Sequence, residues 1–207
     1  PAEEVSVSID GDNVASIRSG PSFFKILGLD VDEFPPLHVF EEPKEFKLEQ
    51  ATLKDALKKT AYAISTDETR YVLNGIFCRF QEGKMTLVAT DGRRLAMVDN
   101  DLEFPESQEG DIIIPTKAVA ELQRLLKDEG EVRMLVGESQ IGFELNQNIL
   151  VSKLIDGNYP NFRQVIPGEA KERVALDRET FLNTVSRISL LTSDKSNSVK
   201  LKFSKDE

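Results

Sequence analysis

The middle of this chain contains the same succession of strand and helix patterns twice, and this internal repeat constrains the fold more than any other sequence feature. Short stretches of alternating apolar and polar residues indicate strands, and each half has one longer stretch with apolar residues at helical spacing. The first half is expected to contain a strand at 46–48, a helix at 50–64, and strands at 70–80, 84–89 and 94–98. The second half is expected to contain a strand at 112–114, a helix at 117–127, and strands at 132–136, 140–145 and 149–155.

The step from strand to helix occurs a third time near the end of the chain. An apolar strand residue precedes an apolar helix residue by five positions at Leu48 and Leu53, at Ile114 and Val119, and at Leu176 and Phe181. The junctions are 66 and 62 residues apart. Further elements are expected at both ends: strands at 5–9, 14–18 and 23–27, and a strand at 174–176, a helix at 179–191 and a strand at 199–203.

The sequence therefore predicts an α+β protein built from repeated βαβββ units, with helices lining one face of antiparallel sheets. Residues 1–43 match the end of a first domain, and residues 44–168 match a complete second domain made of two such βαβββ units. Residues 169–207 match the start of a third domain. The chain is then either an excerpt of a longer protein or one whose two partial ends complete each other.

Composition limits the possible functions. The 207 residues carry a net charge of −10, whereas a protein that binds nucleic acid over its whole surface is normally basic. DNA binding would therefore require basic residues gathered on one face. No run of 18 apolar residues occurs, which predicts no membrane-spanning helix. The single cysteine, Cys78, cannot form an internal disulfide and favours a reducing compartment, here the cytoplasm.

Basic residues recur at similar positions on the three expected helices. Counted from the last strand residue, Lys58 and Lys59 lie at positions 10 and 11, and Arg187 lies at position 11. Lys117 and Arg124, at positions 3 and 10, are seven residues apart and thus share one helix face. This pattern is compatible with a surface that follows DNA phosphates without sequence preference. The spacing alone favours an ordinary solvated helix surface, because Asp55, Glu121 and Asp128 lie on the same helices.

Three segments together resemble the bacterial DNA polymerase III β subunit family, the replicative sliding clamps. They are 69–76 (TRYVLNGI), 87–96 (LVATDGRRLA) and 153–162 (KLIDGNYPNF). The segments 112–118 and 181–191 match as well, so that the resemblance covers essentially the whole chain. It implies the DNA-clamp fold and a head-to-tail homodimeric ring of three-domain chains, with helices around the central hole and sheets on the rim.

The resemblance also implies partners and DNA-contacting residues. The partners are duplex DNA bound without sequence preference, the replicative DNA polymerase, the clamp loader, and repair proteins with clamp-binding motifs. It implies no enzymatic activity, no cofactor and no membrane. The residues expected to contact DNA are Lys117, Arg124, Arg70, Tyr71, Lys58, Lys59 and Arg187.

A groove for partner peptides is implied between the second and third domains. Its expected residues are Leu73, Thr90, Arg93, Arg94, Leu95, Pro167 and Val174. Apolar residues with a cationic and hydroxyl rim can hold a short linear peptide. In the family further groove residues come from the end of the third domain. From the residues alone, 90–93 is a hairpin turn stabilised by Asp91 and Gly92.

Other residues suggest competing functions. Asp91 with Arg93 and Arg94 on a β-scaffold could serve an enzyme acting on phosphorylated substrates. A monomeric peptide-binding module that does not encircle DNA is the second alternative. His38 has no evident catalytic partners and is expected in a solvated linker, and Cys78 is expected to be a buried structural thiol. Asp91, Asp99, Asp101 and Asp111 match no metal-loop spacing.

Overall fold

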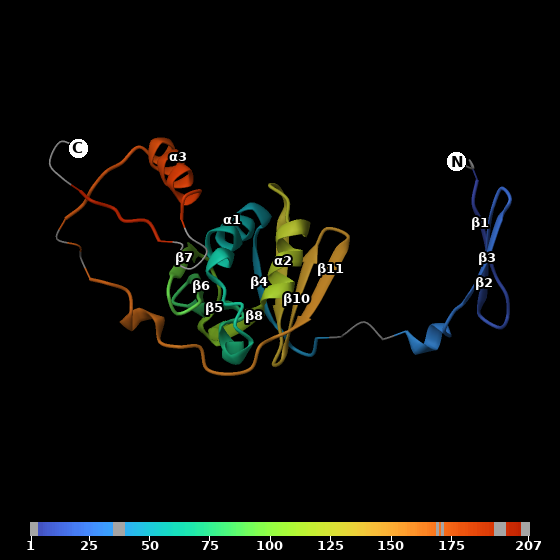
Figure 1. The fold of residues 1–207 in the computed structure, drawn as a ribbon. Helices are drawn as coiled ribbons and strands as arrows, with labels where there is room; N and C mark the ends of the chain where they lie inside the picture. Colours follow the sequence, from blue (N-terminus) through green and yellow to red (C-terminus); the bar gives the residue numbers. More distant parts are fainter. Residues whose placement is uncertain (1–3, 35–39, 169, 171, 193–197, 204–207) are drawn as a thin grey trace. The chain divides into compact units, whose positions relative to one another are not determined.

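The computed structural model describes residues 4–34, 40–168, 170, 172–192 and 198–203 (Figure 1). The chain divides into two compact units, 1–160 and 161–207. The first unit contains three sheets, of which one is formed by the N-terminal strands and two by residues 44–153, hereafter called the central domain. His38 lies outside the described residues.

The central domain follows the predicted order of elements in both halves. The first half comprises β4 (Lys44–Glu49), α1 (Gln50–Thr60), the 3₁₀ helices η2 (Ala61–Ala63) and η3 (Glu68–Leu73), β5 (Gly75–Gln81), β6 (Lys84–Thr90) and β7 (Leu95–Asp101). The second comprises η4 (Glu106–Gln108), β8 (Gly110–Pro115), α2 (Thr116–Leu125), β9 (Glu131–Val136), β10 (Gln140–Leu145) and β11 (Asn148–Lys153). The predicted α+β architecture, in which helices pack on antiparallel sheets, is confirmed.

One predicted strand was too long at its start. Residues 70–73 belong to η3, and β5 begins only at Gly75. The cause is local hydrogen bonding, because the Asp67 side chain accepts from the backbone N–H of Thr69 at 3.0 Å and holds the chain in a tight turn. The apolar alternation over Tyr71 and Leu73 imitates a strand, but only Leu73 is buried. The helix predicted to reach residue 64 likewise ends at Thr60 and continues as η2.

The two halves exchange their first strands. One sheet has the order β7-β6-β5-β8 and the other has the order β11-β10-β9-β4, so β8 completes the sheet of the first half and β4 completes that of the second. All neighbours are antiparallel, with Ile76 opposite Ile114 and Leu48 opposite Val132. Neither half can complete its sheet without the other.

The exchange is fixed by equivalent hydrogen bonds where each helix begins. The backbone N–H of Gln50, the first residue of α1, donates to the carbonyl of Gly130 at 2.8 Å. The backbone N–H of Thr116, the first residue of α2, donates to the carbonyl of Asn74 at 3.1 Å. Gly130 directly precedes β9, which pairs with β4, and Asn74 directly precedes β5, which pairs with β8. The two junctions are therefore equivalent in the two halves.

One core serves both halves. The helices α1 and α2 contact each other, and α1 also packs on β6 and β7 while α2 packs on β5, β8 and β11 (Figure 1). Alternate strand residues point toward these helices, among them Phe46 of β4 and Phe80 of β5, whose rings stack with centroids 3.7 Å apart. Cys78 is 1% exposed within this core, which confirms the predicted buried thiol.

The end segments agree only in part with the sequence prediction. The strands β1 (Ser6–Ile9), β2 (Val14–Ser19) and β3 (Ser22–Leu27) form an antiparallel sheet as expected, followed by the 3₁₀ helix η1 (Val31–Glu33). In the second unit, η5 (Phe162–Gln164) precedes α3 (Arg178–Ser189), which begins at the Asp177 cap.

The predicted strands at 174–176 and 199–203 are wrong for the part of the chain that is described, because neither has a strand beside it. Apolar alternation gives a strand only where another strand satisfies its backbone groups.

The internal repeat offers a matched stability test at the two helix starts. The fully buried Gln50 side chain accepts from the N–H of Lys127 at 3.0 Å and donates to the carbonyl of Glu131 at 3.2 Å. Gln50→Ala leaves these groups without partners and is expected to lower the free energy of unfolding by about 2–3 kcal/mol. The equivalent Thr116 is exposed and its backbone N–H keeps the bond to Asn74, so Thr116→Ala is expected to cost less than about 1 kcal/mol. Urea unfolding followed by circular dichroism measures both, and equal losses would contradict the proposed role of Gln50.

Candidate nucleic-acid and peptide interfaces

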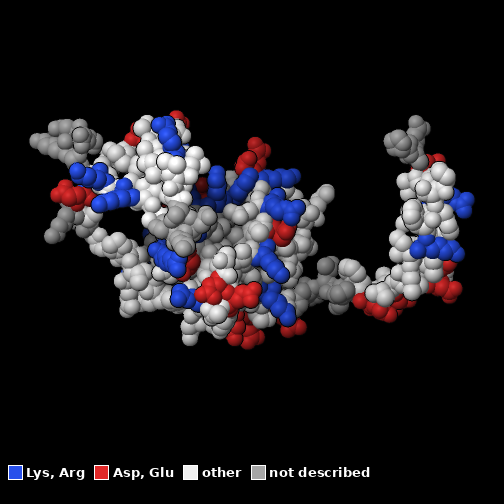
Figure 2. Space-filling view, in the orientation of Figure 1, with Lys and Arg blue, Asp and Glu red and all other residues white. Residues whose placement is uncertain are grey.

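Exposed cations lie on the two adjacent helices of the central domain. Lys58 and Lys59 occupy the last turn of α1, and Lys117 and Arg124 lie on α2. The helices α1 and α2 are in contact, and the exposed surface that carries these four cations is hereafter called the helix surface; Figure 2 shows Lys and Arg side chains over this region. Four of the predicted DNA-binding residues thus lie on two adjacent helices, which also carry the acidic residues Asp55 and Glu121. Arg187 is exposed on α3, in the second unit.

The cations of the helix surface differ in whether they have anionic neighbours. Lys59 pairs with Asp55 at 2.5 Å, and Arg124 pairs with Glu121 at 3.1 Å. Lys58 and Lys117 have no carboxylate within ion-pair distance among the described residues. Exposed pairs of this kind contribute little to stability, so a phosphate can replace the carboxylate at low cost.

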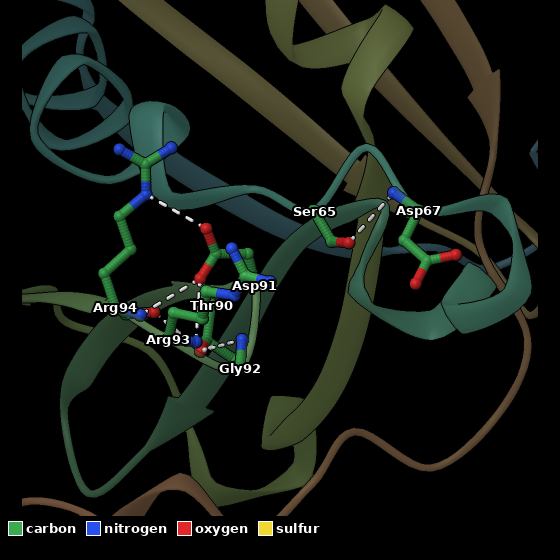
Figure 3. Close-up of polar contacts among 7 residues, drawn as sticks. All are labelled: Ser65, Asp67, Thr90, Asp91, Gly92, Arg93 and Arg94. Carbon is green, nitrogen blue, oxygen red and sulfur yellow. Dashed lines mark hydrogen bonds and ion pairs between the residues drawn. The ribbon is translucent and has the colours of Figure 1, made fainter. Parts of the chain in front are cut away.

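The turn between β6 and β7 is built by its own polar side chains (Figure 3). The Oδ1 atom of Asp91 accepts from the backbone N–H groups of Arg93 at 2.9 Å and Arg94 at 3.0 Å. The Thr90 hydroxyl donates to the carbonyl of Arg94 at 2.7 Å and accepts from the N–H of Gly92 at 3.1 Å. Gly92 has φ 84°, a conformation that glycine adopts without strain. The predicted turn stabilised by Asp91 and Gly92 is confirmed.

These bonds hold the Asp91 carboxylate in its charged form. The N–H groups of Arg94 and then Arg93 keep the pKa of Asp91 below its ordinary value of 3.8, with a smaller contribution from the Arg94 guanidinium. Because the folded pKa is lowered, the carboxylate stabilises the turn at neutral pH, and this stabilisation is lost as the pH falls through the folded pKa.

The 3₁₀ helix η3 lies against this turn. A Cβ atom on Gly92 would lie 2.8 Å from Nη1 of Arg70, so the two come close together. Arg70 also lies 3.8 Å from Asp67, while Tyr71 is 59% exposed beside it. Leu73, at the end of η3, is buried, and Leu95, which follows the turn, is partly buried. The first unit therefore places five predicted groove residues, Leu73, Thr90, Arg93, Arg94 and Leu95, on η3 and the adjoining turn.

Comparison with known proteins identifies the family. The sequence model described as DNA polymerase III beta subunit, central domain, matches residues 47–161, more than half of the chain. The chain belongs to this family.

Individual relatives agree with this assignment. The chain is 34% identical over 203 residues to the beta sliding clamp of Chlamydia muridarum, covering 98% of this chain and 56% of the relative. It is 39% identical over 202 residues to that of Halalkalibacterium halodurans, covering 96% and 53%. The crystal structure of the Bacillus subtilis DNA polymerase sliding clamp superposes with a TM-score of 0.85 at 32% identity, covering 95% of this chain and 52% of that one. The chain thus spans about half the length of the sliding clamps it matches.

The two remaining groove residues of this sliding-clamp segment lie in the second unit. Pro167 and Val174 are exposed there. The sequence prediction did not include two aromatic residues of the first unit that adjoin the turn. Tyr159 stacks on Phe77 with centroids 4.9 Å apart, and burial raises the pKa of Tyr159 to about 12 although the Thr90 backbone opposes the shift. The Tyr62 ring lies 5.6 Å from the Arg94 guanidinium carbon. No local pattern marks Tyr62, because this contact joins η2 to a residue 32 positions later in the chain.

The cysteine and the carboxylates of the described residues form no reactive or metal-binding site. Burial raises the pKa of the Cys78 thiol, which keeps it in the unreactive protonated form. Among the described residues, no group of three His, Cys, Asp or Glu side chains is placed to hold a metal ion. No helix in the described part of the chain is long and apolar enough to cross a membrane.

The role of Asp91 in the turn can be tested by amide hydrogen exchange. Asp91→Ala removes the acceptor for two backbone N–H groups, and exchange at Arg93 and Arg94 is expected to become about tenfold faster. Asp91→Asn keeps an amide oxygen in place and is expected to retain most of the protection. Exchange followed by NMR measures each amide separately, and unchanged rates in Asp91→Ala would show that the turn does not depend on this side chain.

Proposed function

We propose that this chain is part of a DNA sliding clamp that encircles duplex DNA as a head-to-tail homodimeric ring and makes the replicative polymerase processive. In this proposal residues 1–43 belong to the first clamp domain, 44–168 form the second, and 169–207 begin the third. The protein is a non-catalytic, cytoplasmic subunit without a cofactor. Besides DNA and the polymerase, its partners are the clamp loader and repair proteins that carry clamp-binding motifs.

The observation that carries this proposal is the helix surface. It gathers exposed cations on two adjacent helices of a chain whose net charge is −10. Lysine and arginine side chains on a solvated surface bind phosphates through charge and need no base contacts. A ring holds DNA by enclosing it, so such contacts must remain weak enough to allow sliding. Arg70, Tyr71 and Arg187 are proposed as further contacts to DNA.

A second surface is proposed to bind peptides of partner proteins. Leu73 and Leu95 supply its apolar part, and Thr90, Arg93 and Arg94 supply its polar rim, with Pro167 and Val174 completing it from the second unit. The hydrogen bonds of Asp91 and Thr90 hold the turn in one conformation before a partner arrives. A preformed site loses less conformational entropy on binding.

The enzyme alternative is disfavoured by the bonding of Asp91. Its Oδ1 atom accepts from two backbone N–H groups and its Oδ2 atom lies 3.1 Å from Nε of Arg94. A carboxylate engaged in this way, with a lowered pKa, is a weak general base. We expect no turnover of phosphorylated substrates by this protein, and turnover that disappears in Asp91→Ala would favour the enzyme.

The remaining alternative is a monomeric peptide-binding module that does not encircle DNA. It is distinguished by the intact mass of the natural protein in its source cells. A mass near 40 kDa, about three domains of this size, would allow the dimeric ring to close. A mass near 23 kDa would favour the module, whose peptide binding would depend on Leu73 and Leu95 and which would not be retained on circular DNA.

Charge reversal on the helix surface tests DNA binding directly. Lys117→Glu with Arg124→Glu is expected to weaken binding of a fluorescein-labelled duplex at least about tenfold at low salt. The slope of the logarithm of the binding constant against the logarithm of the salt concentration is expected to fall by the equivalent of about two phosphate contacts. Fluorescence anisotropy over a range of salt concentrations measures both effects. The control is Lys47→Glu with Lys84→Glu, which changes the net charge equally at exposed strand positions that alternate with the core-facing Phe46 and Met85. Equal losses in both double variants would contradict a localised DNA surface.

A further inference from the structure

The sheet formed by β4, β9, β10 and β11 has a buried spot on the face turned away from the helices. Val132, Met134 and Val136 of β9 face the helices and belong to the core. Leu135 lies between them and points to the opposite face, because side chains alternate along a strand. It is nevertheless only 8% exposed, and its partner in β10, Gly142, is buried as well. A group outside the sheet therefore covers these two residues.

The aromatic ring of Phe40 covers this spot. A Cβ atom built on Gly142 would lie 2.7 Å from Cε2 and 2.9 Å from Cζ of Phe40, and 3.6 Å from Cβ of Leu135. A Cβ atom built on Gly137, which follows β9, would lie 3.3 Å from Cδ1 of the same ring. The ring therefore rests across two glycines beside Leu135, and these three residues are hereafter called the Phe40 seat.

The two glycines serve the seat because they lack a side chain. Neither Gly137 nor Gly142 has a positive φ, so their backbone conformations do not require glycine. Gly142 lies inside β10 and pairs with Val151 of β11 on its other side. A glycine inside a strand weakens it and often marks the close approach of another group. Phe40 is the group that approaches here, which gives a physical reason for glycine at position 142.

Between Phe40 and β4 the chain crosses the outer face of the sheet. Because the strand order is β11-β10-β9-β4, Gly142 lies two strands away from β4, a distance of about 10 Å. Residues 40–43, hereafter the strap, cover this distance. Glu42 in the strap has φ 44°, which is uncommon for a residue with a side chain, and Pro43 follows it. Such a conformation persists where the structure on both sides holds it, here the Phe40 seat and the pairing of β4 with β9.

We propose that Phe40, held in its seat, anchors the strap to the central domain and fixes the point at which the N-terminal part of the chain leaves it. The fixed structure then begins at residue 40 and not at the start of β4. Burial of an apolar ring against a sheet stabilises the anchored strap against release. The seat involves neither the helix surface nor the turn between β6 and β7, so the inference does not rest on the proposed function. In the proposed clamp, the anchor shortens the connection between the first and second domains, which limits how far they can turn relative to each other.

The test uses NMR on the 207-residue chain. One α-proton of Gly142 takes the direction in which a Cβ atom would meet the Phe40 ring, so a nuclear Overhauser contact between them is expected. The backbone amides of Glu41 and Glu42 are expected to have order parameters of about 0.85, as in rigid structure. Phe40→Ala is expected to lower both values below about 0.6, while the amides of β9 keep theirs.

A methyl group placed in the seat tests the role of the glycine. Gly142→Ala is expected to displace the ring and release the strap as Phe40→Ala does, and to cause no further change when the two are combined. The matched control is Gly168→Ala, because a Cβ atom there meets nothing within 4 Å, and the strap is expected to stay rigid. Phe40 lies outside the core, so Phe40→Ala decides the matter if Gly142→Ala does not fold.

Two results would overturn the anchor. One is the absence of any contact between the Gly142 α-protons and the Phe40 ring in the unchanged chain. The other is a strap whose order parameters are the same with and without the Phe40 ring. A rigid strap in Gly142→Ala, together with a released one in Phe40→Ala, would overturn the part assigned to the glycine.

Discussion

The exchange of first strands between the two halves is the constraint on which the rest of the central domain depends. Because β4 completes one sheet and β8 the other, each helix must begin where its strand leaves the opposite sheet. This fixes α1 and α2 against each other on a shared core, and the hydrogen bonds of Gln50 and Thr116 set the start of each helix at equivalent points. The basic helix surface is thus a consequence of the sheet topology, since neither helix can move without breaking strand pairing.

The same topology places the proposed peptide site. Both η3 and the turn after β6 adjoin the sheet that β8 completes, and the close approach of Arg70 to Gly92 joins them. The turn then keeps its shape through local bonds from Thr90 and Asp91, which need no contact from elsewhere in the chain. A rigid scaffold and a self-supporting turn together explain how exposed arginines can have a defined direction.

Elements and individual contacts were not equally predictable from the sequence. In the central domain, the repeat, the order of strands and helices and the turn at 90–93 followed from periodicity and from Asp and Gly, because these patterns act over a few residues. The strand exchange did not, because periodicity identifies strands and not their neighbours. The 3₁₀ helix at the start of the 70–80 segment was missed, because the apolar alternation there favours a strand. The Asp67 side chain instead accepts a hydrogen bond from the backbone of Thr69 and holds the chain in a tight turn. Tyr62 was missed because its contact with Arg94 exists only after η2 has packed against β6.

The two proposed surfaces use cations in opposite ways, and this difference matches the tasks assigned to them. Lys58 and Lys117 carry charge on flexible chains with no carboxylate beside them in the described structure, so they can follow a phosphate backbone in many positions without selecting one. Lysine is suited to this because its ammonium group has no preferred plane. Arg94 instead has its plane fixed by Asp91 and Tyr62, which suits a contact made in one orientation. Weak, undirected contacts permit movement along DNA, whereas a directed contact permits selection among partners.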